Sequence, residues 1–362
     1  TTNGVHAVTL DRVETFTYDG VAENPKQVVK DFQYDQFGNV TMEADYGDTA
    51  VDGDELFTVR EYAYNQDLWL LDRVKHLYST ATPGGAHLRE SWFQYDGHSD
   101  LNAAPVQGNL TREEHFLDSG ENPVTTYRYD SYGNRTETID PEGRLTRVDY
   151  DADYHAFPVR VTNAMGQVTE RQFDPAIGKP VLERDPNGAE TVYVYDTFKR
   201  LVKVVKPGDS DAFPTMEISY SLDGSAPESV TVKAREQVGT ANTLDTIQSV
   251  DGLGRVIQTR TEYQNPASQV VVDPFHDDMG LESGRSLPYI VATNAGYSAP
   301  LATPKTVIEY DPIGRPLKVT NPDGTHALRG YDHWSVTETD ENGHLKQKWF
   351  DAYGRLAQVT EV

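Results

Sequence analysis

One stretch of the sequence, Tyr310-Asp311-Pro312-Ile313-Gly314-Arg315, has the residue types of a tight turn and recurs along the chain. Asp at the first position of a type I turn accepts a hydrogen bond from the backbone two residues on, and Pro at the second position has its φ already set. Gly at the fourth position can enter the left-handed region that a G1 bulge requires. The aromatic residue before Asp ends one strand, and the β-rich tail after Arg begins the next. We therefore expect an antiparallel hairpin at each copy.

The same pattern recurs in full copies, in two variants and in shorter half-repeats. The full copies are residues 34–39, 129–134, 310–315 and 350–355. The variants are residues 250–255, where Val250 replaces the aromatic, and residues 195–200, where Lys199 replaces the Gly. The half-repeats are residues 140–143, 185–188, 321–324 and 340–343. Glycines 133 and 143, and likewise 314 and 324, stand ten residues apart, a spacing that fits one short strand plus one turn.

The segments between the turns predict strands. Apolar and charged residues alternate with a period of two. No long stretch that is free of Gly and Pro has its apolar residues at helical spacing. The 21 Tyr suit half-exposed sheet faces, because a Tyr ring packs while its hydroxyl stays wet. The fold class we predict is all-β, a repetitive antiparallel sheet of hairpins that coils.

The predicted organisation is one continuous sheet in four stretches. Residues 1–130 hold sheet of the Tyr-Asp type with long hairpins, and residues 131–206 hold regular repeats. Residues 207–304 hold repeats with projecting Pro-rich insertions, and residues 305–362 return to regular repeats. The opening residues Thr1-Thr2-Asn3-Gly4 carry no signal sequence and no initiator Met, so we expect a piece of a longer protein.

Composition narrows the classes of partner. The formal net charge of −25 repels polyphosphate and anionic membranes, so we expect no nucleic acid and no membrane insertion. The chain has no Cys, so neither a disulfide nor a Cys-ligated metal is possible. Apolar runs stay shorter than a membrane helix needs. A soluble, self-repelling particle is one interpretation of the charge, and attraction of a basic protein is the other.

The repeated Tyr-Asp-x-x-Gly-Asn/Arg word resembles the YD repeat of RHS proteins. Residues 251–255, 310–315 and 321–325 are similar to the RHS part of the B component of ABC-type insecticidal toxin complexes. The resemblance covers most of residues 30–362. It implies a continuous β-sheet that spirals into, or forms part of, a hollow shell. In RHS proteins a C-terminal core segment closes the shell and cuts off a downstream toxin. Residues up to Val362 lack that segment, so no self-cleaving residues are assigned.

The resemblance implies a non-catalytic function. The chain would form a shell segment that encapsulates and protects a toxin or other protein cargo for delivery. Its partners would be a protein cargo or a complementary RHS shell subunit. It would be secreted by a bacterium or packaged in a toxin complex. The alternative is an extracellular adhesion or carbohydrate-binding YD-repeat module, which exposed aromatic clusters would favour. A polysaccharide-degrading enzyme ranks third.

Residues whose side chains could bind a metal or carry a glycan are explained more simply by turn geometry. The group Asp273-Pro274-Phe275-His276-Asp277-Asp278 holds metal-ligand types, and Asp45, Asp48, Asp52, Asp54 and Glu55 could suit calcium, but a polar loop explains both. The sequons at Asn39, Asn109 and Asn134 each follow a Gly and suit turns. We expect no catalytic, cofactor-binding or metal-binding residues.

The recurring Asp and Tyr of the repeat have structural roles in this interpretation. Four aspartates are expected to cap turns: Asp35, Asp130, Asp311 and Asp351. Four tyrosines are expected to pack strand on strand: Tyr34, Tyr129, Tyr195 and Tyr310.

Overall fold

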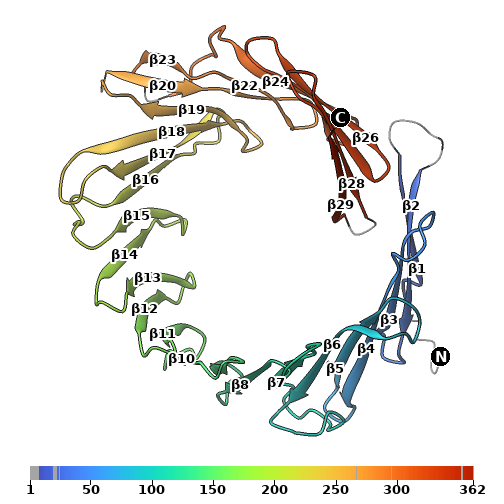
Figure 1. Ribbon diagram of the computed structural model, residues 1–362. Coiled ribbons are helices and arrows are strands. Elements are labelled where there is room, and N and C mark those ends of the chain that lie inside the picture. The colour runs from blue at the N-terminus through green and yellow to red at the C-terminus, as the bar shows by residue number, and fades with distance from the viewer. Residues whose placement is uncertain are drawn as a thin grey trace. The chain divides into compact units, whose positions relative to one another are not determined.

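The computed structural model describes residues 8–18, 23, 25–265, 267–294, 296–351 and 354–361. Throughout these residues the backbone forms strands, turns and bends and no helix, so the all-β prediction is confirmed (Figure 1). A helix able to cross a membrane is accordingly not found in the described part of the chain. Residues 1–4, Pro266, and positions 352 and 353 of the last repeat lie outside the described residues.

The chain divides into two compact units. Unit 1 holds the described residues up to Val168, together with Tyr331–Ser335 and Lys348–Val359. Unit 2 holds Thr169–Gly330 and Val336–Gln347, with residues 360 and 361.

The strands of unit 1 pair antiparallel, each with the next along the chain. They are β1 (Arg12–Thr17), β2 (Lys26–Tyr34), β3 (Val40–Asp48), β4 (Leu56–Asn65), β5 (Leu70–Thr80), β6 (His87–Tyr95), β7 (Leu110–His115), β8 (Val124–Tyr129), β9 (Arg135–Ile139), β10 (Leu145–Tyr150) and β11 (Pro158–Thr162). Successive pairing of this kind is what short local turns dictate, because a tight turn can join only neighbouring antiparallel strands.

The later strands also pair antiparallel, but their pairing does not follow the order of the chain throughout. They are β12 (Val168–Asp174), β13 (Lys179–Arg184), β14 (Glu190–Tyr195), β15 (Leu201–Val205), β16 (Met216–Ser221), β17 (Glu228–Arg235), β18 (Thr243–Val250), β19 (Val256–Glu262), β20 (Ser268–Val272), β21 (Pro274–His276), β22 (Glu282–Ser286), β23 (Tyr289–Ala292), β24 (Lys305–Tyr310), β25 (Pro316–Thr320), β26 (His326–Asp332), β27 (Ser335–Thr339), β28 (Leu345–Phe350) and β29 (Leu356–Glu361). The range 207–304 therefore contains strands β16–β23 with longer connections between several of them.

The expectation of one continuous sheet is wrong within unit 2. Strand β20 pairs with β19 and β23, whereas β21 pairs with β22, which in turn pairs with β24. The two ladders part at Asp273, whose backbone N–H donates to Ser286 Oγ at 2.8 Å. Pro274 follows and has no N–H to donate, so the chain leaves the first ladder here.

Among the described residues, buried hydrophobic side chains are few. They are Val29, Ala44, Phe57 and Ala63 in unit 1, and Val204, Ile247 and Val271 in unit 2. Most strand residues are instead half-buried. A half-buried sheet face favours Tyr, whose ring can pack while its hydroxyl reaches a polar partner.

Candidate functional site

The turn at Asp311 has the geometry that its sequence predicts. Asp311 Oδ1 accepts the backbone N–H of Ile313 at 3.0 Å and of Arg315 at 2.8 Å. Asp311 Oδ2 accepts Arg315 Nε at 2.6 Å. Gly314 donates its N–H to the Asp311 carbonyl at 3.0 Å and has a φ of 83°. Asp311 therefore caps the turn and joins its first residue to its last.

The other predicted caps behave in the same way. The carboxylate accepts the backbone N–H four residues on at Asp35, Asp130, Asp140, Asp185, Asp196, Asp251, Asp340 and Asp351. At Asp251, the backbone N–H of Arg255 and then its guanidinium hold the pKa of the carboxyl below its usual range. These carboxylates serve as hydrogen-bond acceptors for their own turns, as predicted for Asp35, Asp130, Asp311 and Asp351.

Asn takes the place of Arg in two copies and ties the turn to a neighbouring segment. Asn134 Nδ2 donates to Asp130 Oδ2 at 3.0 Å and to the His155 carbonyl at 2.7 Å. Asn39 Nδ2 likewise donates to Asp35 Oδ2 and to the carbonyl of Leu71. Asn109 Nδ2 donates to the side chain of Gln107. Turn geometry therefore accounts for the Asn of all three sequons.

Two copies of the turn carry insertions, so the regular spacing of the repeat does not reveal them in the sequence. Asp96 donates its N–H to the Asn109 carbonyl at 2.8 Å, so the turn closes around the intervening residues. The Asp96 carboxylate accepts backbone N–H groups from all four of residues 106–109. Asp151 closes in the same way on Phe157. In both cases a Tyr-Asp pair marks the start of the turn in the sequence, and the residue that closes the turn comes later than in a regular copy.

The aromatic residue of the repeat has a second role beyond packing. The hydroxyl of Tyr310 donates to the carbonyl of Glu282, the first residue of β22, at 2.8 Å. Tyr62, Tyr150 and Tyr220 reach the first residue of the preceding strand in the same way. Tyr34, Tyr95 and Tyr195 also donate to backbone carbonyls in the neighbouring segment. Each hydroxyl thus joins a hairpin to the strand before it by a hydrogen bond.

A β-bulge accompanies the turn at several copies of the repeat. Tyr310 lies opposite Pro316, while Glu309 lies opposite Lys318, so Leu317 is the extra residue of its strand. The register shifts at the same place beside Tyr129, Tyr195 and Val250. A bulged strand bends and twists more strongly than a regular one. The repeat therefore carries a bend as well as a turn.

The suspected metal groups are not brought together as ligands. Asp277 begins a further copy of the turn: its Oδ1 accepts the N–H groups of Met279 and Leu281, and Gly280 donates to its carbonyl. Asp45 pairs with Lys30 at 2.7 Å, and Asp54 accepts the N–H of Asp48 at 3.1 Å. Over the described residues, clusters of three or more metal-ligating side chains are not found. In the sequence, Gly280 stands three residues after Asp277, and this spacing indicated a turn.

Asp273 belongs to a buried polar network that the sequence did not indicate. Gln258 Nε2 donates to Asp273 Oδ1 at 2.7 Å, and Arg260 Nε donates to Gln258 Oε1 at 2.8 Å. The Arg260 guanidinium also contacts the Ser298 hydroxyl. Burial, and then the hydrogen bond to Asp273, raise the pKa of Tyr289 to about 12. Arg260, Gln258 and Asp273 are each at most 1% exposed.

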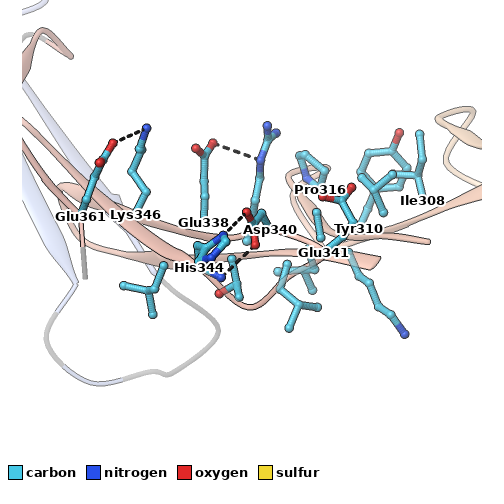
Figure 2. A pocket seen from close by; sticks show the side chains of 17 residues that line it. Ile308, Tyr310, Pro316, Glu338, Asp340, Glu341, His344, Lys346 and Glu361 are labelled. Atoms are coloured by element: carbon cyan, nitrogen blue, oxygen red, sulfur yellow. Dashed lines mark hydrogen bonds and ion pairs between the residues drawn. The ribbon is translucent and has the colours of Figure 1, made fainter. Parts of the chain in front are cut away.

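A groove of about 800 Å³ lies over strands β24, β25, β26 and β28 of unit 2 (Figure 2). Leu317 and Leu328 line it and remain 38% and 41% exposed. Carboxylates and cations also line it, among them Glu338, Arg329 and Lys346. The sequence places Leu317 in the strand that follows a turn, and no neighbouring residue indicates that Leu317 is the extra residue of a bulge.

Comparisons with known proteins agree with the repeats. The sequence pattern of one family, described as RHS Repeat, matches residues 106–145. That range contains the turns at Asp130 and Asp140, and it begins inside the insertion that Asp96 closes. No curated protein matches the sequence.

Several solved structures of TcdB2-TccC3 have similar folds. The crystal structure of TcdB2-TccC3-Cdc42 superposes with a TM-score of 0.75 at 12% identity, over 98% of this chain and 28% of that chain. That of TcdB2-TccC3 has a TM-score of 0.75 at 13% identity, over 97% and 25%. That of TcdB2-TccC3 without its hypervariable C-terminal region has a TM-score of 0.73 at 11% identity, over 97% and 28%. The chain thus spans about a quarter of the length of those chains.

Identities this low show the fold alone, and here the fold agrees with the repeat motifs. The chain carries a match to the RHS Repeat family over residues 106–145, and its fold is similar to that of the solved TcdB2-TccC3 chains.

Proposed function

We propose that the chain is a non-catalytic segment of an RHS shell that encloses a protein cargo, protects it and releases it on delivery. The observation that carries this proposal is the agreement of the fold with TcdB2-TccC3 over 98% of the chain. The partner would be the cargo itself or a complementary shell subunit, and the place of action a secreted bacterial toxin complex.

The repeat chemistry supports a wall that is stable without a large core. The repeat hairpins are closed by Asp–backbone caps such as that of Asp311, and several are tied to the preceding strand by a Tyr–carbonyl bond such as that of Tyr310. These bonds are local, so the wall can be extended repeat by repeat. The residues that recur serve the backbone, which leaves no recurring group for catalysis.

Charge supports a basic cargo. The net charge of −25 attracts a positively charged polypeptide over long range, and salt screens such attraction within about 10 Å at 0.1 M. Cargo association should therefore weaken as salt rises. Association that does not change with salt would contradict the electrostatic part of the proposal.

Two measurements test the enclosure. Small-angle scattering should give a radius of gyration above the roughly 21 Å of a solid globule of this length. Cargo in the full-length protein should resist a protease that digests it once the shell is denatured. A compact globule together with rapid digestion of the cargo would overturn the proposal. Glycan-array binding by the chain would instead favour the adhesion module.

A further inference from the structure

We infer that the groove over β24, β25, β26 and β28 binds an extended polypeptide segment with apolar side chains and flanking Lys or Arg residues. This inference rests on the proposed enclosure of a polypeptide and adds a specific contact site to it.

The apolar part of the groove comes from the repeat itself. Leu317 is the extra residue of the bulge in β25, and Leu328 follows on the next strand opposite Lys318. Both side chains are more than one third exposed within unit 2. Ile308, Val319 and Leu345 line the same groove. Covering these side chains would remove apolar surface from water, which is worth about 25 cal/mol per Å².

The size of the groove fits a peptide better than a single side chain. Its volume of about 800 Å³ lies in the upper part of the range of binding clefts. The lining residues come from strands β24 to β28 and from Glu361 in β29. Figure 2 shows Lys346, Glu338 and Tyr310 spread along it. An elongated cleft across several strands favours an extended chain.

The rim carries an excess of negative charge. Four carboxylates line the groove, those of Glu338, Asp340, Glu341 and Glu361. Two of them are neutralised by lining cations, because Arg329 contacts Glu338 at 3.4 Å and Lys346 contacts Glu361 at 2.8 Å.

The other two carboxylates lack a comparable cation. Asp340 contacts His344 at 2.8 Å, and Glu341 accepts a hydrogen bond from Asn321 at 3.0 Å. The third lining cation, Lys318, contacts Glu309, which does not line the groove, at 3.6 Å. The Asp340 carboxylate is thus occupied within its own turn, whereas Glu341 remains available to attract Lys or Arg beside an apolar stretch.

The test is fluorescence anisotropy with a labelled peptide of about ten residues, in which Leu alternates with Ser between two Lys at each end. The full chain should bind it, and binding should weaken as salt rises. Two control peptides, one with Ser for Leu and one with Glu for Lys, should bind at least about tenfold more weakly.

Matched variants locate the binding. Leu328→Glu should weaken binding about tenfold or more, whereas Leu244→Glu should change it less than about twofold. Leu244 is 42% exposed but does not line the groove. Glu341→Lys should weaken binding, whereas Glu142→Lys, in a turn of unit 1, should not. If Leu328→Glu does not fold by circular dichroism, Leu317→Ser takes its place.

Other outcomes would overturn the inference. Equal effects of Leu328→Glu and Leu244→Glu, or no binding of the Leu/Lys peptide, would do so. Sedimentation that shows a dimer lost only in Leu328→Glu would assign the groove to a second copy of the chain. Failure of peptide binding together with intact protease protection of cargo would remove this site and leave the proposed enclosure standing.

Discussion

Arg315 donates from Nε to Asp311 Oδ2 over 2.6 Å, so the last side chain of the turn is bound to the first. The same Asp311 carboxylate also accepts two backbone N–H groups, and Asp311 as a whole is only 9% exposed. One residue thus supports three hydrogen bonds in a segment of five. The predictions below follow from this arrangement and from its departures elsewhere in the chain.

Asp311→Ala should destabilise its hairpin by about 2 kcal/mol, because hydrogen bonds to a charged acceptor contribute about 1.5–3 kcal/mol. Amide hydrogen exchange at Ile313 and Arg315 should speed up accordingly. Asp118→Ala, at an exposed position outside the turns, is the control and should leave that exchange unchanged. Unchanged exchange in Asp311→Ala would show that the cap is not needed.

Lys199→Gly should stabilise the protein by about 1 kcal/mol. Lys199 stands at the Gly position of its turn and has a φ of 67°, where a residue with a Cβ is strained by about 1–2 kcal/mol. The gain is partly offset because Gly is more flexible in the unfolded chain. Urea denaturation of the full chain measures the difference.

The reverse exchange in the same repeat position is the control for Lys199→Gly. Gly254 has a φ of 77°, and a Cβ there would meet no atom within 4 Å. Gly254→Lys should therefore lower stability by about 1 kcal/mol through backbone strain alone. A change of the same sign in both variants would contradict the explanation.

The Asp151 turn should lose its bonds only at low pH. Burial raises the pKa of Asp151, but the backbone N–H groups of Phe157, Tyr154 and Ala156 outweigh it and lower that pKa to about 2. An unfolded Asp titrates near 3.9. The contribution of Asp151 is therefore fully present above about pH 4 and is lost as the pH falls through about 2. The amide resonances of Tyr154 and Ala156 should follow this transition, and Asp151→Asn should remove it.

Tyr95→Phe should destabilise unit 1 by about 1 kcal/mol, the value of a typical hydrogen bond. The Tyr95 hydroxyl donates to the Val74 carbonyl at 2.8 Å, and burial is the main cause that raises its pKa to about 12. This contribution is present below about pH 10, where an unfolded Tyr begins to ionise, and is lost as the pH rises through about 12. Absorbance titration of the phenol, compared between wild type and Tyr95→Phe, checks the assignment.

Arg260→Met should destabilise unit 2 by about 3 kcal/mol, because it leaves the buried side-chain oxygens of Gln258 and Gln269 without the guanidinium that donates to them. Arg260 is 1% exposed. Hydrogen exchange should rise in residues 296–304, which the Ser298 contact holds against β19. Arg128→Met is the control, since the Arg128 side chain is 74% exposed and its contact with Glu137 should contribute less than about 1 kcal/mol. Equal losses in both variants would show that burial of Arg260 is unimportant.

The sequence predicted the parts of this fold that are decided within a few residues. The Asp cap, the left-handed Gly and the strand after it lie within one repeat, so the residue types at 311, 314 and 315 were sufficient. The same rule fails where the repeat is interrupted. At Asp96 and Asp151 the turn closes on a distant residue, and at Asp277 the flanking residues differ from the repeat, so only a polar loop was predicted there.

Longer-range features could not be predicted in this way. The break between the two ladders at Asp273 and the network of Gln258, Arg260 and Ser298 join segments that are up to 40 residues apart. The groove exists because a bulge turns Leu317 outward beside Leu328 on the next strand. The sequence by itself therefore determined the turns, the pairing of strands that a tight turn joins and the all-β class, because hydrogen bonds within five residues decide them. Only the tertiary structure decided where the ladder splits and which apolar side chains stay exposed together, because those depend on contacts between strands.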